Sequence, residues 1–281
     1  MPTKTLKIGL AAVIVLGVVV GAVAHGTESP PSPSPPPPSA EQAFTPIMPL
    51  GDSMTLGIQA TGGMPRFVAY DGYREDLWLR LRDDAGIKPD FVGSCPRDTW
   101  DRFKCSKGRG TMDDPDHEGH SGFRVHQLSA FIDGWIDEAQ PKIVLLMVGT
   151  NDLCDACDRE HAPGRLADLV GEIMARLPAD GRLFVATIPR RHDVRGAYVD
   201  AYNAEVPGVV DAAEAAHPGR VHLVPQHVVG EEAGDMSPDG VHPSACGYAK
   251  LAFVWYRAMD ERMPGDWDLG ESPFEGHGAC A

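Results

Sequence analysis

Residues Ile47–Gly57 read Ile-Met-Pro-Leu-Gly-Asp-Ser-Met-Thr-Leu-Gly, an apolar run that stops at a Gly-Asp-Ser turn. The run is typical of a short buried strand, and the turn presents Ser53 at the end of that strand. Open α/β folds bind their ligands at the carboxyl ends of the strands. Ser53 can therefore be a nucleophile if the chain brings a base to it, and it is otherwise a turn residue or a helix cap.

The rest of the chain alternates between strand and helix patterns. Continuous apolar runs at 142–149 and 182–188 are typical of parallel strands buried on both faces, and shorter strands are expected at 90–93 and 221–224. Helical patterns occupy 73–82, 125–139, 164–177, 198–216 and 245–263. This alternation predicts an α/β fold with a central parallel sheet between layers of helices.

The amino terminus has the three parts of a secretory signal peptide. Lys4 and Lys7 precede the apolar stretch 8–20, and Ala-Val-Ala at 22–24 is a cleavage motif. An uncleaved membrane anchor is the alternative, although Ile8 to Ala24 is only 17 residues long. The sequence therefore predicts a secreted or cell-surface protein.

Three further segments follow this signal. Residues 25–43 form a Pro/Ser-rich linker with the extended character of polyproline. Residues 44–264 are expected to form one α/β domain, large enough to have its own core, and residues 265–281 a polar tail.

The formal net charge of −15 excludes some partners. An acidic surface repels nucleic acid and anionic membranes, so neither is an expected partner, and membrane contact is expected only if the N-terminal segment stays uncleaved. A neutral polymer or a small ester is compatible with this charge.

Six cysteines fit an exported protein and allow fifteen disulfide pairings. We expect local pairs: Cys95 with Cys105, Cys154 with Cys157, and Cys246 with Cys280. The Cys-x-x-C motif at 154–157 could instead be redox-active or half of a zinc site, but an oxidising compartment favours a structural disulfide.

Asp239 and His242 are three residues apart near the carboxyl terminus. At this spacing the carboxylate can hold one imidazole nitrogen, which leaves the other nitrogen to take a proton from Ser53. The alternative is a loop with an Asp turn residue and a surface histidine.

Two further motifs offer hydrogen-bond donors. Asn151 follows the strongest predicted strand, and its side-chain amide suits a developing oxyanion, although Asn151 and Asp152 could also be a turn or a helix cap. Gly122 ends a long polar loop and can present its backbone N–H, or it can be an ordinary loop glycine.

Taken in order, these motifs resemble the SGNH hydrolase superfamily, also called the GDSL-like esterases and lipases. The matching blocks are Gly51-Asp52-Ser53, Gly122, 149–152 and Asp239-x-x-His242. The resemblance implies a flavodoxin-like three-layer α/β/α sandwich. It also implies that Ser53 is the nucleophile, His242 the base and Asp239 its orienting partner, with an oxyanion hole formed by the N–H groups of Ser53 and Gly122 and the amide of Asn151.

A narrower resemblance is to the secreted branch that contains carbohydrate esterase family three, whose members are mostly acetylxylan esterases. It rests on 47–53, 72–74, 90–94, 117–122 and 239–243. Leu56 departs from this branch, which usually has an acidic residue there, and the segments 95–105 and 153–158 depart as well. The resemblance implies an esterase that deacetylates a carbohydrate such as acetylated xylan. A lipase or phospholipase-like esterase and a non-catalytic carbohydrate-binding module are the alternatives.

The loop before Gly122 contains several potential metal ligands: Asp113, Asp114, Asp116, His117, Glu118 and His120. Their spacing matches neither the H-E-x-x-H motif of zinc enzymes nor the calcium-loop pattern. We expect no cofactor, with bound calcium as the alternative.

Overall fold

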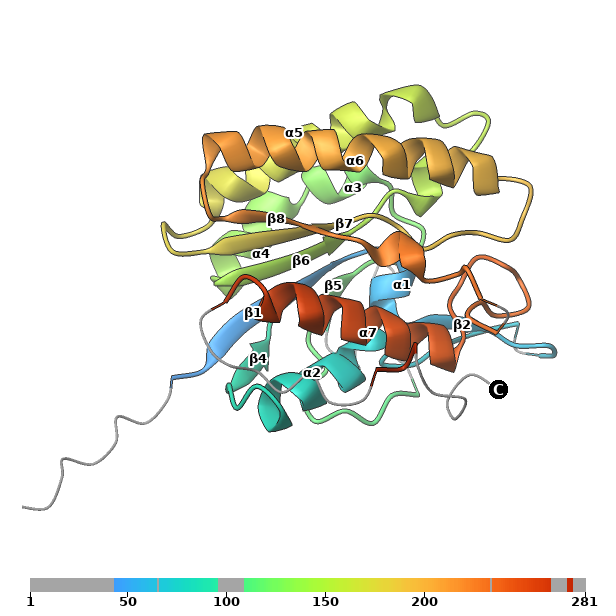
Figure 1. Ribbon diagram of the computed structural model, residues 1–281, viewed down its shortest axis with the longest axis horizontal. Helices are drawn as coiled ribbons and strands as arrows, with labels where there is room; N and C mark the ends of the chain where they lie inside the picture. Colours follow the sequence, from blue (N-terminus) through green and yellow to red (C-terminus); the bar gives the residue numbers. More distant parts are fainter. Residues whose placement is uncertain (1–42, 65, 96–108, 233, 264–271, 275–281) are drawn as a thin grey trace, which may run out of the picture. The chain divides into compact units, whose positions relative to one another are not determined.

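The computed structural model describes residues 43–64, 66–95, 109–232, 234–263 and 272–274 (Figure 1). The predicted signal peptide and nearly all of the predicted linker lie outside these residues, as do Cys105 and Cys280. No helix among the described residues is long and apolar enough to cross a membrane.

A parallel sheet forms the centre of the domain, with strands in the order β4-β1-β6-β7-β8 and β5 paired to the end of β1. The strands are β1 (Thr45–Gly51), β4 (Pro89–Phe91), β5 (Glu118–Gly119), β6 (Ile143–Met147), β7 (Arg182–Ala186) and β8 (Val221–Val224). This is the strand order of flavodoxin-like folds. Every residue of β6 is buried, as expected for a strand covered on both faces.

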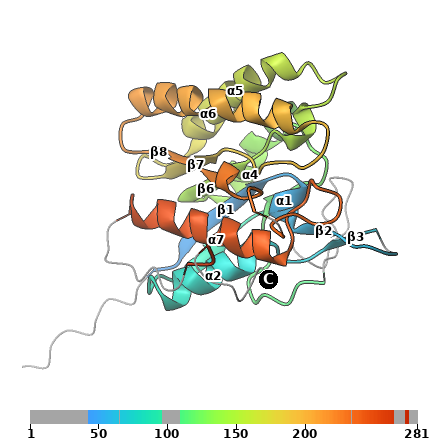
Figure 2. The ribbon, with the colours of Figure 1, turned by 45° about the vertical axis from the view of Figure 1, so that its right-hand side comes forward.

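Helices cover both faces of this sheet (Figures 1 and 2). On one face α2 (Tyr73–Asp83) packs against α7 (Ala245–Asp260). The other face is covered by α3 (Val125–Ser129), α4 (Ile132–Ala139), α5 (Ala162–Arg176) and α6 (Gly196–Ala216). The predicted three-layer α/β/α sandwich is therefore confirmed.

The topology brings distant segments together at one edge of the sheet. β1 lies between β4 and β6, so the chain extends to opposite sides of β1 in its first and second crossovers. Ligands of such sheets bind in the crevice at this switch point, beyond the carboxyl ends of the strands. Ser53 follows β1 there, and Asn151 follows β6.

Two local features differ from the sequence-based expectations. A small antiparallel hairpin, β2 (Ile58–Ala60) and β3 (Phe67–Ala69), occupies a stretch for which no strand was predicted. The single helix predicted at 125–139 is divided into α3 and α4. The Phe131 N–H bonds to the Leu128 carbonyl three residues back at 2.9 Å, a tightened turn that ends the first helix.

Three residues of the predicted polar tail are described, and one of them packs on the domain. Phe274 is partly buried against the core, with its ring centroid 6.3 Å from that of Phe253 on α7.

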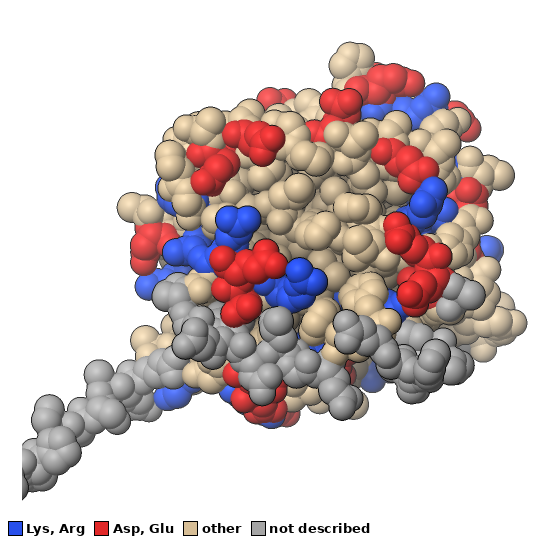
Figure 3. Space-filling view, in the orientation of Figure 1, with Lys and Arg blue, Asp and Glu red and all other residues tan. Residues whose placement is uncertain are grey.

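On the face drawn in Figure 3, acidic and basic side chains are interspersed and an uncharged area lies between them. The net negative charge is thus not gathered in one patch on this face.

Candidate active site

The serine turn is built from three consecutive residues. Gly51 ends β1 so close to β6 that a Cβ atom would collide with the Met147 carbonyl oxygen, which explains the glycine. Asp52 caps the short helix α1 (Ser53–Leu56), because its Oδ1 accepts the Met54 N–H at 3.0 Å. Ser53 is therefore the first residue of α1 and only 6% exposed. Its own N–H bonds to none of the described residues.

Arg74 supports this turn from behind. Its Nε donates to the Thr55 carbonyl at 3.0 Å and its Nη2 to the Leu56 carbonyl at 3.3 Å, so the guanidinium satisfies the last carbonyls of α1. Leu56 is only 2% exposed. Leu56 therefore packs behind the turn and does not line an open, substrate-facing surface.

The structure brings Ser53, His242 and Asp239 into one hydrogen-bonded chain. His242 Nε2 lies 2.9 Å from Ser53 Oγ, and His242 Nδ1 lies 2.6 Å from Asp239 Oδ2. The second carboxylate oxygen, Oδ1, accepts the N–H groups of Val241 and His242, each at 3.0 Å. Both ends of the imidazole are thus held, with one nitrogen facing the serine.

The pKa values of the two aspartates near Ser53 are shifted in opposite directions. Burial opposes ionisation of Asp239, but the hydrogen bonds from His242 and Val241 outweigh it and hold the Asp239 pKa below its usual value. Asp52 is fully buried, and this burial raises its pKa to about 6 in spite of the Met54 hydrogen bond. Asp239 is therefore the carboxylate suited to stabilise a positive charge on His242.

The loop that carries His242 is tied to α7. Lys250 is buried on that helix, and its Nζ donates to Asp235 Oδ1 at 2.8 Å. The other Asp235 oxygen accepts the N–H groups of Gly230 at 2.9 Å and Glu232 at 3.2 Å. This buried ion pair fixes the start of the loop, and sequence reasoning did not find it.

The loop that carries Gly122 is held at several points. The Gly119 N–H donates to His117 Nδ1 at 2.9 Å, and the His120 N–H donates to the Gly51 carbonyl at 2.9 Å. Burial lowers the pKa of His117 well below its usual value, so its neutral ring can accept this bond. Gly122 has φ of 79°, and its N–H bonds to none of the described residues. That N–H remains available to a ligand.

Asn151 lies in the 3₁₀ turn η1 (Thr150–Asp152) after β6. Its Nδ2 donates to the Phe123 carbonyl at 2.9 Å and lies 3.4 Å from Asp52 Oδ2. The side-chain amide therefore joins the Gly122 loop to the serine turn. Asp152 has the capping role that the sequence also suggested, since its Oδ2 accepts the Val125 N–H at the start of α3 at 3.0 Å.

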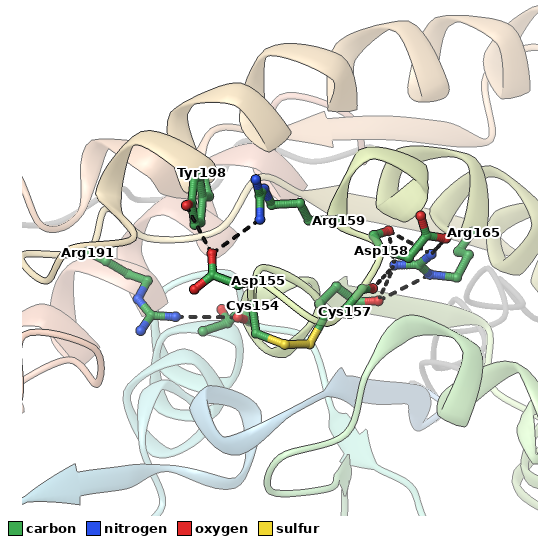
Figure 4. The surroundings of a disulfide bond; sticks show 10 residues. Cys154, Asp155, Cys157, Asp158, Arg159, Arg165, Arg191 and Tyr198 are labelled. Atoms are coloured by element: carbon green, nitrogen blue, oxygen red, sulfur yellow. Dashed lines mark hydrogen bonds and ion pairs between the residues drawn. A yellow bond between two sulfur atoms is a disulfide. The ribbon is translucent and has the colours of Figure 1, made fainter.

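A disulfide closes the segment directly after Asn151. Cys154 and Cys157 are bonded, as predicted (Figure 4). Arg165 donates to Asp152 Oδ1 at 3.0 Å and to the Cys157 carbonyl at 3.4 Å. The segment is therefore fastened both covalently and by α5.

Two other cysteines are also in disulfides, namely Cys95 and Cys246. Their predicted partners, Cys105 and Cys280, lie outside the described residues, so these two pairings stay predictions.

One group of potential metal ligands stands among the described residues: Cys95, Glu118 and His120 lie with ligand atoms within 4.8 Å of one another. Cys95 is in a disulfide and offers no thiolate. Glu118 already accepts the Ser94 N–H at 2.5 Å and lies 2.8 Å from His120 Nε2. These side chains fit a hydrogen-bonded support for the Gly122 loop better than a metal site.

The calcium alternative concerned the acidic residues nearby. Asp114 accepts the Phe91 N–H at 2.6 Å and the Trp78 indole N–H at 3.2 Å, so it fastens the loop to β4 and α2. Burial, with Asp90 and Asp116 close by, raises the pKa of Asp114. This carboxylate already accepts two hydrogen bonds within the fold. The one group of potential metal ligands among the described residues does not include Asp113, Asp114 or Asp116.

The hairpin adds a residue that the sequence reasoning missed. Phe67 on β3 has its ring centroid 5.7 Å from that of His242, edge to face at 65°. A signal was present, since Ile58-Gln59-Ala60 and Phe67-Val68-Ala69 flank two glycines in the manner of a hairpin.

Comparison with known proteins agrees with this geometry. The model of the GDSL-like Lipase/Acylhydrolase family matches residues 50–250, which is more than half of the chain. The chain belongs to this family. Its membership places it among the carboxylic ester hydrolases and confirms the SGNH resemblance.

Two solved structures narrow the relationship. A family 3 carbohydrate esterase from Clostridium thermocellum is 30% identical with a TM-score of 0.63, over 78% of this chain and 96% of that one. A carbohydrate esterase family 3 structure from Talaromyces cellulolyticus is 25% identical with a TM-score of 0.62, over 77% and 97%. This GDSL-family chain is therefore related to family 3 carbohydrate esterases.

A curated relative shows a similar level of identity. The multidomain esterase of Ruminococcus flavefaciens is 28% identical over an alignment of 238 residues that covers 76% of this chain. The match covers only 28% of that relative's own length. The similarity thus concerns one part of a longer protein.

Proposed function

We propose that this protein is a secreted serine esterase that removes acetyl groups from a carbohydrate such as acetylated xylan. The observation that carries the proposal is the hydrogen-bonded chain from Ser53 through His242 to Asp239, with distances of 2.9 and 2.6 Å. A nucleophile, a base within reach of it and a carboxylate that orients the base are what acyl transfer requires.

In the first half of the reaction Ser53 Oγ attacks the ester carbonyl carbon as His242 Nε2 takes its proton. The bond to the alcohol oxygen then breaks, and His242 returns the proton to that oxygen, so the acetyl group stays on Ser53. In the second half His242 takes a proton from water, which attacks the acetyl-Ser53 carbonyl. Acetic acid leaves and ionises to acetate in water, and His242 returns its proton to Ser53. Asp239 stays ionised throughout and stabilises the transient imidazolium.

The negative oxygen that develops on the carbonyl needs donors. We assign this role to the N–H groups of Ser53 and Gly122 and to the side-chain amide of Asn151. The two backbone groups have no partner among the described residues. The 3.4 Å contact between Asn151 and Asp52 is long, so that amide N–H can turn to an oxyanion.

The acetylated carbohydrate is inferred from the relatives, two of which are described as family 3 carbohydrate esterases. A neutral polysaccharide also suits a chain with a formal net charge of −15, whereas a polyanion does not.

Acetate release from acetylated xylan, acetylated chitin and simple acetate esters tests the proposal, with Ser53→Ala as the control. We expect release from acetylated xylan by the wild type and none above background by Ser53→Ala. A series of p-nitrophenyl esters with longer acyl chains should show a maximum at acetate. A maximum at long chains would instead favour a lipase-like enzyme, and sugar binding without any release would favour a non-catalytic module.

Secretion is proposed from the signal-like residues 1–24. N-terminal sequencing of the protein from the culture medium of an expressing cell checks it. A mature chain that begins at His25 supports cleavage, and an intact Met1 in the membrane fraction supports an anchor.

A further inference from the structure

Phe67 is an exposed aromatic residue beside the candidate base. It is 43% exposed, although its neighbours Val68 and Ala69 are buried. Its ring meets the His242 ring edge to face with a centroid distance of 5.7 Å. A single exposed apolar side chain is ordinary, but this one lies against the ring of the candidate base, where a bound substrate can cover it.

The hairpin that carries Phe67 is fastened to the rest of the domain. The Tyr248 hydroxyl on α7 donates to the Ile58 carbonyl at 2.6 Å, and the Tyr70 N–H donates to the Gly57 carbonyl at 2.8 Å. The first bond anchors β2 to α7, and the second closes the hairpin at Gly57, the residue that ends α1, so the hairpin starts at the serine turn and extends away from it (Figure 2). This anchoring sets the position of Phe67 before any ligand binds.

The position of Phe67 next to His242 decides whether it contacts the alcohol part or the acyl part of a bound ester. His242 must return its proton to the oxygen of the departing alcohol, so the alcohol part of the ester lies next to the imidazole. The carbonyl oxygen turns the other way, towards the donors of Gly122 and Asn151. A side chain packed on the His242 ring therefore faces the alcohol and not the acyl group.

We propose that Phe67 forms the subsite for the alcohol part of the substrate and stacks on the ring of a neutral pyranose sugar. This inference rests on the esterase function proposed above and adds the residue that recognises the leaving group. The C–H face of a pyranose matches an open aromatic ring. The Arg66 guanidinium lies over the Phe67 ring at 5.2 Å from its centroid, which restrains the ring and brings hydrogen-bond donors for sugar hydroxyls.

The test compares two substrates that share the acetyl group and differ in the alcohol. An acetylated xylooligosaccharide reaches Phe67, and ethyl acetate has an alcohol too small to do so. For Phe67→Ala we expect the ratio of kcat/KM for the sugar ester to that for ethyl acetate to fall about tenfold, mainly through KM of the sugar ester. Phe67→Tyr keeps an aromatic face and should restore most of the ratio.

Phe44→Ala is the matched control. Phe44 is also exposed, at 66%, and has the Lys88 cation over its ring. It precedes β1, however, and so lies at the amino end of the strand that Ser53 follows at the carboxyl end. This variant should leave the ratio unchanged. Thermal unfolding of each variant shows that it is folded, as expected for changes at exposed positions.

Three outcomes separate the inference from the function on which it rests. An unchanged ratio in Phe67→Ala overturns the inference while the esterase function stands. An equal loss on both substrates also overturns it, because Phe67 would then act only through His242. A wild-type protein that hydrolyses neither ester overturns the proposed function and the inference together.

Discussion

Two aspartates lie near the site, and either could be taken for the partner of His242. Asp52 is next to Ser53 in the chain, and Asp239 is three residues before His242. The Asp52 carboxylate accepts the Met54 N–H and contacts the Asn151 amide, and burial raises its pKa to about 6. Asp239 receives His242 and keeps a lowered pKa. The roles of the two carboxyl groups thus follow from their surroundings and not from their distance along the chain to the serine.

The raised pKa of Asp52 predicts a pH-dependent cost to stability. The folded state holds this proton up to a pH of about 6 and the unfolded state only to about 3.8. Stability therefore falls as pH rises through this window, by about 3 kcal/mol. Asp52→Asn removes the titration and keeps an oxygen to accept the Met54 N–H. Relative to the wild type, its free energy of unfolding should rise by about 2 kcal/mol between pH 4 and pH 7, because part of the window lies below pH 4.

Urea unfolding of both proteins at these two pH values measures the effect. A difference between variant and wild type that is the same at pH 4 and pH 7 would show that Asp52 does not titrate in this range.

Asn151 allows a second prediction at this scale. If its amide holds the oxyanion, Asn151→Ala should lower kcat on acetate esters by about 100- to 1,000-fold, with a much smaller change in KM. Steady-state kinetics measures this, and circular dichroism checks the fold. A folded variant with wild-type kcat would remove Asn151 from the mechanism.

The long buried strands β6 and β7 were predictable from the sequence. β6 and β7 lie within runs at 142–149 and 182–188 whose strand residues are all apolar after Lys142 and Arg182, and such runs are typical of a sheet covered on both faces. The hairpin was not predictable in this way. Its only sequence signal is the pair of glycines between two largely apolar triplets, because each strand has three residues, too few to show a period. Its anchor on α7, Tyr248, is 190 residues from Ile58. Phe67 was missed for the same reason.

The disulfide after β6 gives a prediction about stability. Closing so short a loop restricts the unfolded chain modestly, so replacing Cys154 and Cys157 by serine should lower the free energy of unfolding by about 2 kcal/mol. Arg165 still holds Asp152 and the Cys157 carbonyl, so Asn151 should keep its place and kcat should change only a few-fold. Denaturant unfolding and steady-state kinetics check the two parts. A fall in kcat as large as that of Asn151→Ala would mean that the disulfide positions the oxyanion donor.

For the whole molecule, the sheet topology explains how separate motifs form one site. Ser53 and His242 are 189 residues apart, yet their side chains are in hydrogen-bond contact. The order of the motifs along the chain was sufficient to predict the family and the candidate residues. The geometry was not, because the distances depend on contacts such as Lys250 with Asp235 that join α7 to the His242 loop. Such a pair, 15 residues apart, has no pattern in the sequence that marks it.

In the proposed reaction Ser53 carries the acyl group. To detect this intermediate, the protein is mixed with p-nitrophenyl acetate, the reaction is stopped with acid within the first turnovers, and the peptides are mapped by mass spectrometry. We expect acetylation of the peptide that contains Ser53, at Ser53 itself, and no such modification in Ser53→Ala, whose turnover should fall by several orders of magnitude. Undiminished turnover by Ser53→Ala, or an acetyl group trapped only on another residue, would contradict the account.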